Sequence, residues 1–253
     1  MLNYVEDGKE NKYDDDIFFQ KYSQMSRSQQ GLAGAGEWET LRKLLPDFKD
    51  KRVLDLGCGY GWHCIYAMEH GASSVVGVDI SHKMLEVAKE KTHFPQVEYK
   101  CCAIEDVEFP EESFDVILSS LAFHYVADYE ILVKKIYRIL KSGGKLVFTI
   151  EHPVFTAYGT QDWYYNEKGE ILHFPVDNYY YEGKRTAVFL GEKVTKFHRT
   201  LTTYLNTLLS NGFIINHIVE PQPPENMMDI PGMQDEMRRP MMLIVSANKK
   251  VDI

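Results

Sequence analysis

The sequence lacks several features that would decide its class at once. Its 253 residues contain no run of about 18 or more apolar residues, so no membrane-spanning helix is predicted. Residues 1–16 are polar and acidic, without the basic start and apolar middle of a secretory signal. The formal net charge is −9, which disfavours DNA or RNA as a partner. We therefore expect a cytoplasmic protein with neither a membrane nor a nucleic-acid partner.

Cysteine is also scarce, and its spacing excludes the common cysteine motifs. The four cysteines, Cys58, Cys64, Cys101 and Cys102, form no Cys-x-x-Cys pair. Their spacing fits neither a zinc site nor a thioredoxin motif, and we expect reduced thiols. His63 lies between Cys58 and Cys64, but ordinary helix packing explains these three residues better than a metal site does. We predict no metal.

The middle of the chain alternates between apolar runs and amphipathic segments. The expected strands are 52–57, 74–79, 97–103, 114–120 and 145–152, and the expected helices are 60–70, 82–91 and 129–144. This alternation predicts an α/β fold with a parallel sheet and helices on both faces. Two closing strands, 213–221 and 240–249, have no crossover helix between them and predict an antiparallel hairpin.

Two segments lie outside this alternation. Residues 17–30 have apolar positions at helical spacing, and together with a helix that Pro46 ends they predict a helical cap over residues 1–48. Residues 1–16 are expected to be frayed. Residues 153–198 are aromatic and charged without a clear period, and a segment of this length predicts a lid inserted before a last helix.

Three glycines follow the first expected strand, in Gly57-Cys58-Gly59-Tyr60-Gly61. Glycine is favoured where a turn needs positive φ or where a ligand lies against the backbone. Asp79 ends the second strand, the usual position of a carboxylate that binds a ribose diol. Trp62 replaces the last small residue of the dinucleotide fingerprint, and Asp55 suits a ligand with an amine and a positive centre. The loop therefore predicts a nucleoside site rather than a pyrophosphate site.

The stretch VLDLGCGYG…VVGVDIS resembles the first two motifs of the class I S-adenosylmethionine-dependent methyltransferases. Two later stretches, FPEESFDVILSSLAFHYVADYE and ILKSGGKLVFTIEHP, resemble the segments around that family's fourth and fifth strands. The resemblance spans about residues 50–152. It implies one class I methyltransferase domain over residues 1–253, a Rossmann-like three-layer sandwich. Its seven-stranded, mostly parallel sheet would carry its last strand antiparallel beside the fifth.

The same resemblance implies a function. It points to an enzyme that transfers a methyl group from S-adenosylmethionine, its cofactor, to a small-molecule acceptor by in-line displacement. Two alternatives stay open at this point: an S-adenosylmethionine-binding protein without transferase activity, and an NAD-dependent oxidoreductase. Trp62 at the third fingerprint position counts against the oxidoreductase.

The resemblance also implies most of the cofactor-binding residues, which are Asp55, Gly57, Gly59, Gly61, Asp79, Ile80, Met84, Ile104, Glu105 and Ser119. Tyr22 and Arg27 are added as candidates because the N-terminal segment could fold over the cofactor. The glycines would wrap the methionine portion, Asp79 would bind both ribose hydroxyls, and Met84 would pack on the adenine. Tyr22 would lie near the sulfonium and Arg27 near the carboxylate, although ordinary packing of their helix is an alternative.

Three residues beyond the fourth and fifth strands are candidate catalytic groups: His124, Glu151 and His152. Methyl transfer needs mainly alignment and the exclusion of water, and needs a base only when the acceptor arrives protonated. His124 has a neutral-range intrinsic pKa and could accept a proton, with packing at the end of the sheet as an equal alternative. The aromatic residues of 153–198 suit a pocket for a flat molecule, a hairpin flap or a contact in a homodimer.

Overall fold

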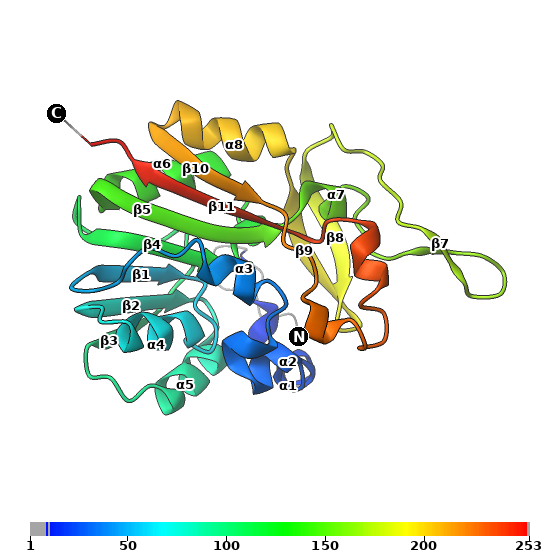
Figure 1. Ribbon diagram of the computed structural model, residues 1–253, viewed down its shortest axis with the longest axis horizontal. Helices are drawn as coiled ribbons and strands as arrows, with labels where there is room; N and C mark the ends of the chain where they lie inside the picture. Colours follow the sequence, from blue (N-terminus) through cyan, green and yellow to red (C-terminus); the bar gives the residue numbers. More distant parts are fainter. Residues whose placement is uncertain (1–8, 10, 252–253) are drawn as a thin grey trace.

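The protein is described from a computed structural model, which covers residues 9 and 11–251. A seven-stranded sheet forms its centre, in the order β10-β11-β5-β4-β1-β2-β3 (Figure 1). The strands are β1 (Arg52–Leu56), β2 (Ser74–Asp79), β3 (Val97–Cys101), β4 (Phe114–Ser120), β5 (Leu140–Glu151), β10 (Phe213–Val219) and β11 (Met242–Lys249). Strands β1 to β5 run parallel, and β11 lies antiparallel between β5 and β10. This confirms the predicted fold class.

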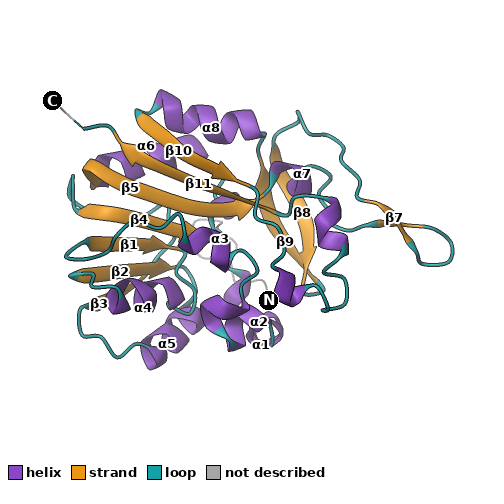
Figure 2. Ribbon diagram, viewed as in Figure 1, coloured by secondary structure: helices purple, strands orange, loops and turns teal. Residues whose placement is uncertain are grey.

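Helices cover both faces of the sheet and complete three layers (Figure 2). One face carries α3 (Trp38–Arg42), α4 (Trp62–Glu69) and α5 (His82–Lys91), and the other carries α6 (Tyr129–Ile139) and α8 (Leu201–Ser210). Alternate residues of a strand point to opposite faces. In β1, accordingly, Val53 packs in the cluster with α3 and α4, while Leu54 packs in the cluster with α6 and α8. No helix in the described residues is long and apolar enough to cross a bilayer.

Several expected boundaries were wrong for local reasons. The helix expected over 129–144 ends at Ile139, because Leu140 turns to the extended conformation and already pairs with Phe114 in the sheet. The single helix expected over 17–30 is split into α1 (Asp16–Ser23) and α2 (Ser26–Gln29), followed by the 3-10 turn η2 (Gly31–Gly34). At Met25, between α1 and α2, the backbone is extended, with φ −65° and ψ 148°, which interrupts the helical pattern.

The segment 11–15, expected to be frayed, is ordered around the 3-10 turn η1 (Lys12–Asp14). The side chain of Asp15 caps α1 by accepting hydrogen bonds from the backbone N–H groups of Ile17 and Phe18. Residues 1–8 and 10, which belong to the same prediction, lie outside the described residues. We call residues 11–34 the N-terminal cap.

The insertion over 153–198 has regular structure that its sequence did not indicate. It contains α7 (Pro153–Thr156), the short pair β6 (Tyr164–Tyr165) and β7 (Ile171–His173), and the pair β8 (Gly183–Phe189) and β9 (Glu192–His198). The β8–β9 hairpin closes through Leu190 and Gly191, both with positive φ, as a two-residue hairpin turn requires. The remaining short elements are the 3-10 turns η3 (Phe123–Tyr125), η4 (Glu225–Met227) and η5 (Asp235–Arg238).

The N-terminal cap and the β8–β9 hairpin pack on one another. Phe18 of α1 is fully buried and contacts Ala187 and Val194 of the hairpin in a separate apolar cluster, with Tyr13 and Phe189 packed against it. Both units lie at the edge of the sheet toward which the parallel strands point (Figure 1). Binding sites of open α/β sheets lie at this edge, so the two units roof the expected site.

Replacing Phe18 by Ala should loosen the N-terminal cap while the sheet stays folded. Phe18 is 0% exposed and its neighbour Ile17 is 60% exposed. Truncating a buried Phe costs about 3–5 kcal/mol in contacts, which here belong to a small cluster separate from the main core. Amide hydrogen exchange across residues 16–23 should accelerate in Phe18→Ala and stay unchanged in Ile17→Ala. An equal loss of protection in β4 and β5 would contradict this separation.

Candidate functional site

The glycine loop after β1 has the geometry that its sequence predicts. Gly57, Gly59 and Gly61 all have positive φ, at 78°, 52° and 75°. A Cβ atom at Gly57 would lie 2.4 Å from the Cβ of Ala122, and one at Gly61 would lie 2.2 Å from the hydroxyl of Tyr99. Neither position tolerates a side chain, so the backbone itself forms this surface.

Asp79 fastens the loop to the end of β2. Its Oδ2 accepts a hydrogen bond from Gly59 N at 2.8 Å, and its Oδ1 accepts one from Ser81 N at 2.9 Å. Each carboxylate oxygen keeps further acceptor capacity, which two ribose hydroxyls could use. Burial raises the pKa of Asp79 to about 6, although the backbone donors oppose the rise. Its placement fits the predicted ribose contact.

Asp55 lies beneath the loop and is 1% exposed. Its Oδ2 accepts from the Cys64 thiol at 3.5 Å, and among the described residues its Oδ1 has no hydrogen-bond partner. Burial raises the pKa of Asp55 to about 7, with a further rise from Asp79. An unpartnered, buried carboxylate oxygen favours a nearby cation, and the ammonium group of a methionine moiety would provide one.

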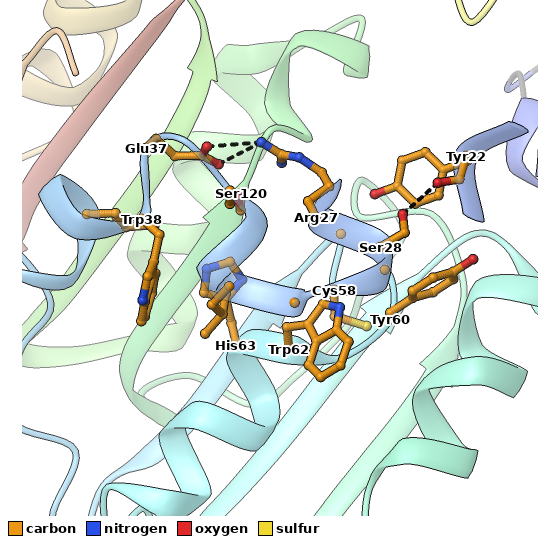
Figure 3. Close-up of a pocket in the computed structure, with 16 residues that line it drawn as sticks. Tyr22, Arg27, Ser28, Glu37, Trp38, Cys58, Tyr60, Trp62, His63 and Ser120 are labelled. Carbon is orange, nitrogen blue, oxygen red and sulfur yellow. Dashed lines mark hydrogen bonds and ion pairs between the residues drawn. The ribbon is translucent and has the colours of Figure 1, made fainter. Parts of the chain in front are cut away.

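A pocket of about 80 Å³ opens between the N-terminal cap, α3 and the glycine loop. Figure 3 shows Tyr22 and Arg27 entering from the cap, with Cys58 and Trp62 on the opposite side. Nη2 of Arg27 donates to both carboxylate oxygens of the buried Glu37, at 3.1 and 3.0 Å. Glu37 therefore balances the charge of Arg27 and fixes its position, and the other guanidinium nitrogens can still serve a ligand carboxylate.

Two further pocket residues were not predicted as part of the site: His63 was attributed to helix packing, and nothing local in the sequence marks Glu37. His63 is half-buried, its pKa is lowered by desolvation to about 4, and its Nε2 has no partner among the described residues. Glu37 is 3% exposed and pairs across ten positions with Arg27. Arg27 lies in the cap and Glu37 follows it, and only the folded structure brings the two side chains together.

The N-terminal cap also reaches the adenosine side of the site. Asn11 donates from Nδ2 to the carbonyl of Ile80 at 3.2 Å. Asp14 accepts from the Ser81 hydroxyl at 2.6 Å and from the backbone N–H of Lys83 at 3.1 Å, which places a carboxylate at the start of α5. Residues 11–14 belong to the segment expected to be frayed, so these contacts were not predicted. The acidic run around Asp14 was the feature of the sequence that pointed to a contact here, but Ser81, the partner of Asp14, lies 67 residues away along the chain.

The other predicted adenine contacts have mixed surroundings. Met84 is buried, and its Cε would lie 3.3 Å from a Cβ at Gly59, so it reaches the loop. Ile104 is buried in the core cluster on the α6 side. The backbone carbonyl of Glu105 accepts from Lys135 at 2.6 Å. The roles of these residues at the cofactor stay predictions.

Ser119, expected beside the methionine portion, lies at the end of β4. It is 2% exposed, and its hydroxyl donates to the carbonyl of Leu56 at 2.8 Å. The adjacent Ser120 lines the pocket instead. Because side chains alternate along a strand, the end of β4 presents only one of the two serines to the site. Ser119 ties β4 to β1 and supports the loop from behind.

The three catalytic candidates fall into two groups. Nδ1 of His124 accepts from Glu151 N at 3.3 Å, so His124 in η3 and Glu151 at the end of β5 are neighbours. His152, the next residue, makes different contacts: its Nδ1 accepts from Val154 N at 3.1 Å as the cap of α7, and its Nε2 lies 2.9 Å from Glu220 Oε1. These contacts give His152 the role of fixing the start of α7.

Comparisons with known proteins agree with this geometry. A family described as the methyltransferase domain matches residues 54–148. A solved structure from Listeria monocytogenes, assigned to the S-adenosylmethionine-dependent methyltransferases, is 57% identical, with a TM-score of 0.83 over 87% of this chain and 99% of that chain. The S-adenosylmethionine-dependent methyltransferase of Mesorhizobium loti is 40% identical, with a TM-score of 0.80 over 87% of this chain and 100% of that chain.

A third relative matches only part of the chain. The ubiquinone biosynthesis O-methyltransferase of Coxiella burnetii is 36% identical over 112 residues, which is 44% of this chain and 47% of that protein. The identity and coverage of the two solved structures decide the family. This chain belongs to the S-adenosylmethionine-dependent methyltransferases, enzymes whose methyl donor is S-adenosylmethionine. The oxidoreductase alternative is thereby excluded.

Asp55→Asn should stabilise the cofactor-free protein and weaken cofactor binding. The pKa of Asp55 is about 7 in the folded protein and about 4 when unfolded, so ionisation costs stability as pH rises through this window. The advantage of the variant should grow from about pH 4 to about pH 7 and then level off at roughly 4 kcal/mol. Urea denaturation across this range would measure it, with the exposed Asp229→Asn as the control. A pH-independent difference would contradict the prediction.

Proposed function

We propose that the protein methylates a small organic molecule bound under the N-terminal cap and the β8–β9 hairpin. The observation that carries this proposal is the roof itself. The cap contributes Tyr13, whose hydroxyl lies 3.3 Å from that of Tyr125 in η3, the turn that follows β4. The hairpin contributes Lys196, whose Nζ lies 2.5 Å from Glu151 Oε1 at the end of β5. Space closed on these sides suits a small acceptor better than a macromolecular one.

The residues around the glycine loop fit S-adenosylmethionine as a set. Asp79 would accept from the ribose hydroxyls, Asp55 would face the amino group, and Arg27 would face the carboxylate. When bound, S-adenosylmethionine supplies a methyl group on a sulfonium, whose departure leaves a neutral thioether. The aromatic rings of Tyr22 and Tyr60 meet edge to face, with centroids 5.8 Å apart, above the loop. Such rings favour a neighbouring positive charge.

In-line displacement requires the protein mainly to align the acceptor with the methyl group and to exclude water from the site. The ring centroids of Tyr13 lie 5.2 Å from Tyr22 and 6.4 Å from Tyr125, so three tyrosines from two distant segments form one wall. Phe18 packs against Tyr13, with ring centroids 5.1 Å apart, and this aromatic group would help to keep water from an acceptor beneath it. The Coxiella burnetii relative, named for ubiquinone biosynthesis, acts on a small molecule and supports the same class of acceptor.

The proposal is tested by following labelled methyl groups. The protein would be incubated with methyl-labelled S-adenosylmethionine and a cell extract separated into metabolites, proteins and nucleic acids. We expect label in the metabolite fraction alone. Label in the protein or nucleic-acid fraction, or cofactor binding without any transfer, would overturn it. A homodimer and a cytoplasmic location stay predictions of the sequence.

Asp79→Asn should weaken binding of S-adenosylhomocysteine by roughly ten- to a hundredfold, because a hydrogen bond to a charged group contributes about 1.5–3 kcal/mol. For the unmodified protein, affinity should fall as pH drops below about 6, where Asp79 gains a proton and loses acceptor capacity. Isothermal titration calorimetry between about pH 5 and 8 measures both effects. Asp16→Asn, whose side chain is 96% exposed, is the matched control. Unchanged affinity in Asp79→Asn would refute the ribose contact.

A further inference from the structure

A buried charged cluster lies beyond β5 and was not recognised in the sequence. Lys196 of β9 is 2% exposed. Its Nζ donates to Glu151 Oε1 at 2.5 Å and to Gln161 Oε1 at 2.8 Å, while Gln161 Nε2 donates to Glu151 Oε2 at 2.5 Å. The ammonium group also lies over the rings of Tyr125 and Phe189, at 5.9 and 5.4 Å. The cluster therefore adjoins the aromatic wall of the proposed acceptor site.

Neither titratable candidate in this region is suited to removing a proton. Burial alone would raise the pKa of Glu151, but attraction from His124 and Lys196 lowers it, and both carboxylate oxygens are already bonded. His124 accepts from Glu151 N at Nδ1, so the neutral ring carries its proton on Nε2 and offers a donor there. Burial lowers the pKa of His124 to about 4, which keeps the ring neutral. The region therefore supplies hydrogen-bond donors. Neither Glu151 nor His124 is suited to remove a proton from a methyl acceptor.

The buried charges are also unequal. Arg199, 6% exposed, donates to the carbonyls of Val126 and Ala127 at 2.5 and 2.8 Å and takes part in none of the ion pairs of the described residues. The pKa of His124, which burial lowers, is raised by Glu151 and lowered further by Lys196 and Arg199, so all three charges lie near this buried ring. Lys196 is paired with Glu151 at 2.5 Å, which leaves Arg199 as the cation without a carboxylate partner among the described residues. Glu182, the carboxylate bonded to Thr200, is exposed to solvent and compensates less. A bound anion would offset this excess.

We infer that the methyl acceptor is an anionic oxygen nucleophile, a carboxylate or an ionised phenol, and that Lys196 supplies the positive charge that selects it. The inference rests on the proposed function and adds the acceptor's chemical class. The acceptor oxygen forms a bond to the methyl carbon, the carbon–sulfur bond breaks, and its electron pair stays on the sulfur. The negative charge of the oxygen and the positive charge of the sulfonium cancel. No proton is released, so no base is required.

Matched probes test the charge preference by binding alone. Benzoate and benzylamine have similar size and opposite charge, and each would be titrated calorimetrically into protein saturated with S-adenosylhomocysteine. We expect benzoate to bind at least about tenfold more tightly than benzylamine, as a charged hydrogen bond implies. Equal binding, or tighter binding of benzylamine, would overturn the inference. Failure to bind S-adenosylhomocysteine in the first step would instead count against the proposed function.

Variants then assign the effect to Lys196. Lys196→Met alone would leave Glu151 as a buried charge without a partner, so the double variant E151Q/K196M is used. This double variant should bind benzoate roughly tenfold more weakly than the unmodified protein does. Glu151→Gln alone leaves the positive charge in place and should strengthen benzoate binding. Lys193→Met removes an exposed lysine of the same strand and should change nothing. Benzoate affinity in E151Q/K196M equal to that of the unmodified protein would refute the role of Lys196.

The pH profile gives an independent readout. Without an enzymatic base, methyl transfer to benzoate under saturating cofactor should be flat between about pH 7 and 9, because benzoate is fully ionised there. Transfer to a phenol should rise with the ionisation of the phenol itself, whose intrinsic pKa is about 10. A rate with the phenol that rises through neutrality, following a group of the protein instead of the phenol, would show a general base and overturn the inference.

Discussion

The site depends on hydrogen bonds that hold a side-chain-free loop between two strands. Gly57 N and Cys58 N both donate to the carbonyl of Val78, at 2.8 and 2.9 Å, and Gly59 N donates to Asp79. A loop of glycines is conformationally costly to order, and these bonds from the end of β2 offset that cost. The residue that is expected to bind the ribose is therefore also the residue that fixes the loop, so its position is set before a ligand arrives.

Closure of the site is built from segments that are remote in the chain. Asp14 binds the start of α5, Phe18 enters the β8–β9 hairpin, and Arg27 and Glu37 pair over the pocket. Each contact fastens the N-terminal cap to a different part of the domain. The cap shares with the hairpin a small apolar cluster that is separate from the main core, so it can open at lower cost than the sheet can unfold. A ligand enclosed beneath the roof needs such a movement to enter and leave.

The parts of the structure that follow from short-range patterns could be predicted from the sequence. The five parallel strands, the glycine turn and the placement of Asp79 each depend on residues that are close along the chain. The ion pair of Lys196 with Glu151 could not be predicted, because the two residues lie 45 positions apart. The segment that separates them has no clear periodicity in its sequence. The order of residues 11–15 was missed for the same reason, since the bond from Asp14 crosses to Ser81. Ser119 and Ser120 show a further limit of prediction from sequence. Side chains were known to alternate along the strand, but the sequence did not show which of the two serines faces the pocket.

The electrostatics of the site link its stability to its ligand. Burial raises the pKa values of Asp55 and Asp79, so both carboxylates are less stable as ions in the folded protein than in the unfolded chain. A cofactor that carries a sulfonium and an ammonium group supplies positive charge where these carboxylates lack it, and its ribose hydroxyls supply donors. Binding therefore recovers stability that the empty fold gives up near neutral pH. The roof tyrosines reinforce this effect because they exclude water, which would otherwise screen the attraction between the carboxylates and the bound cation.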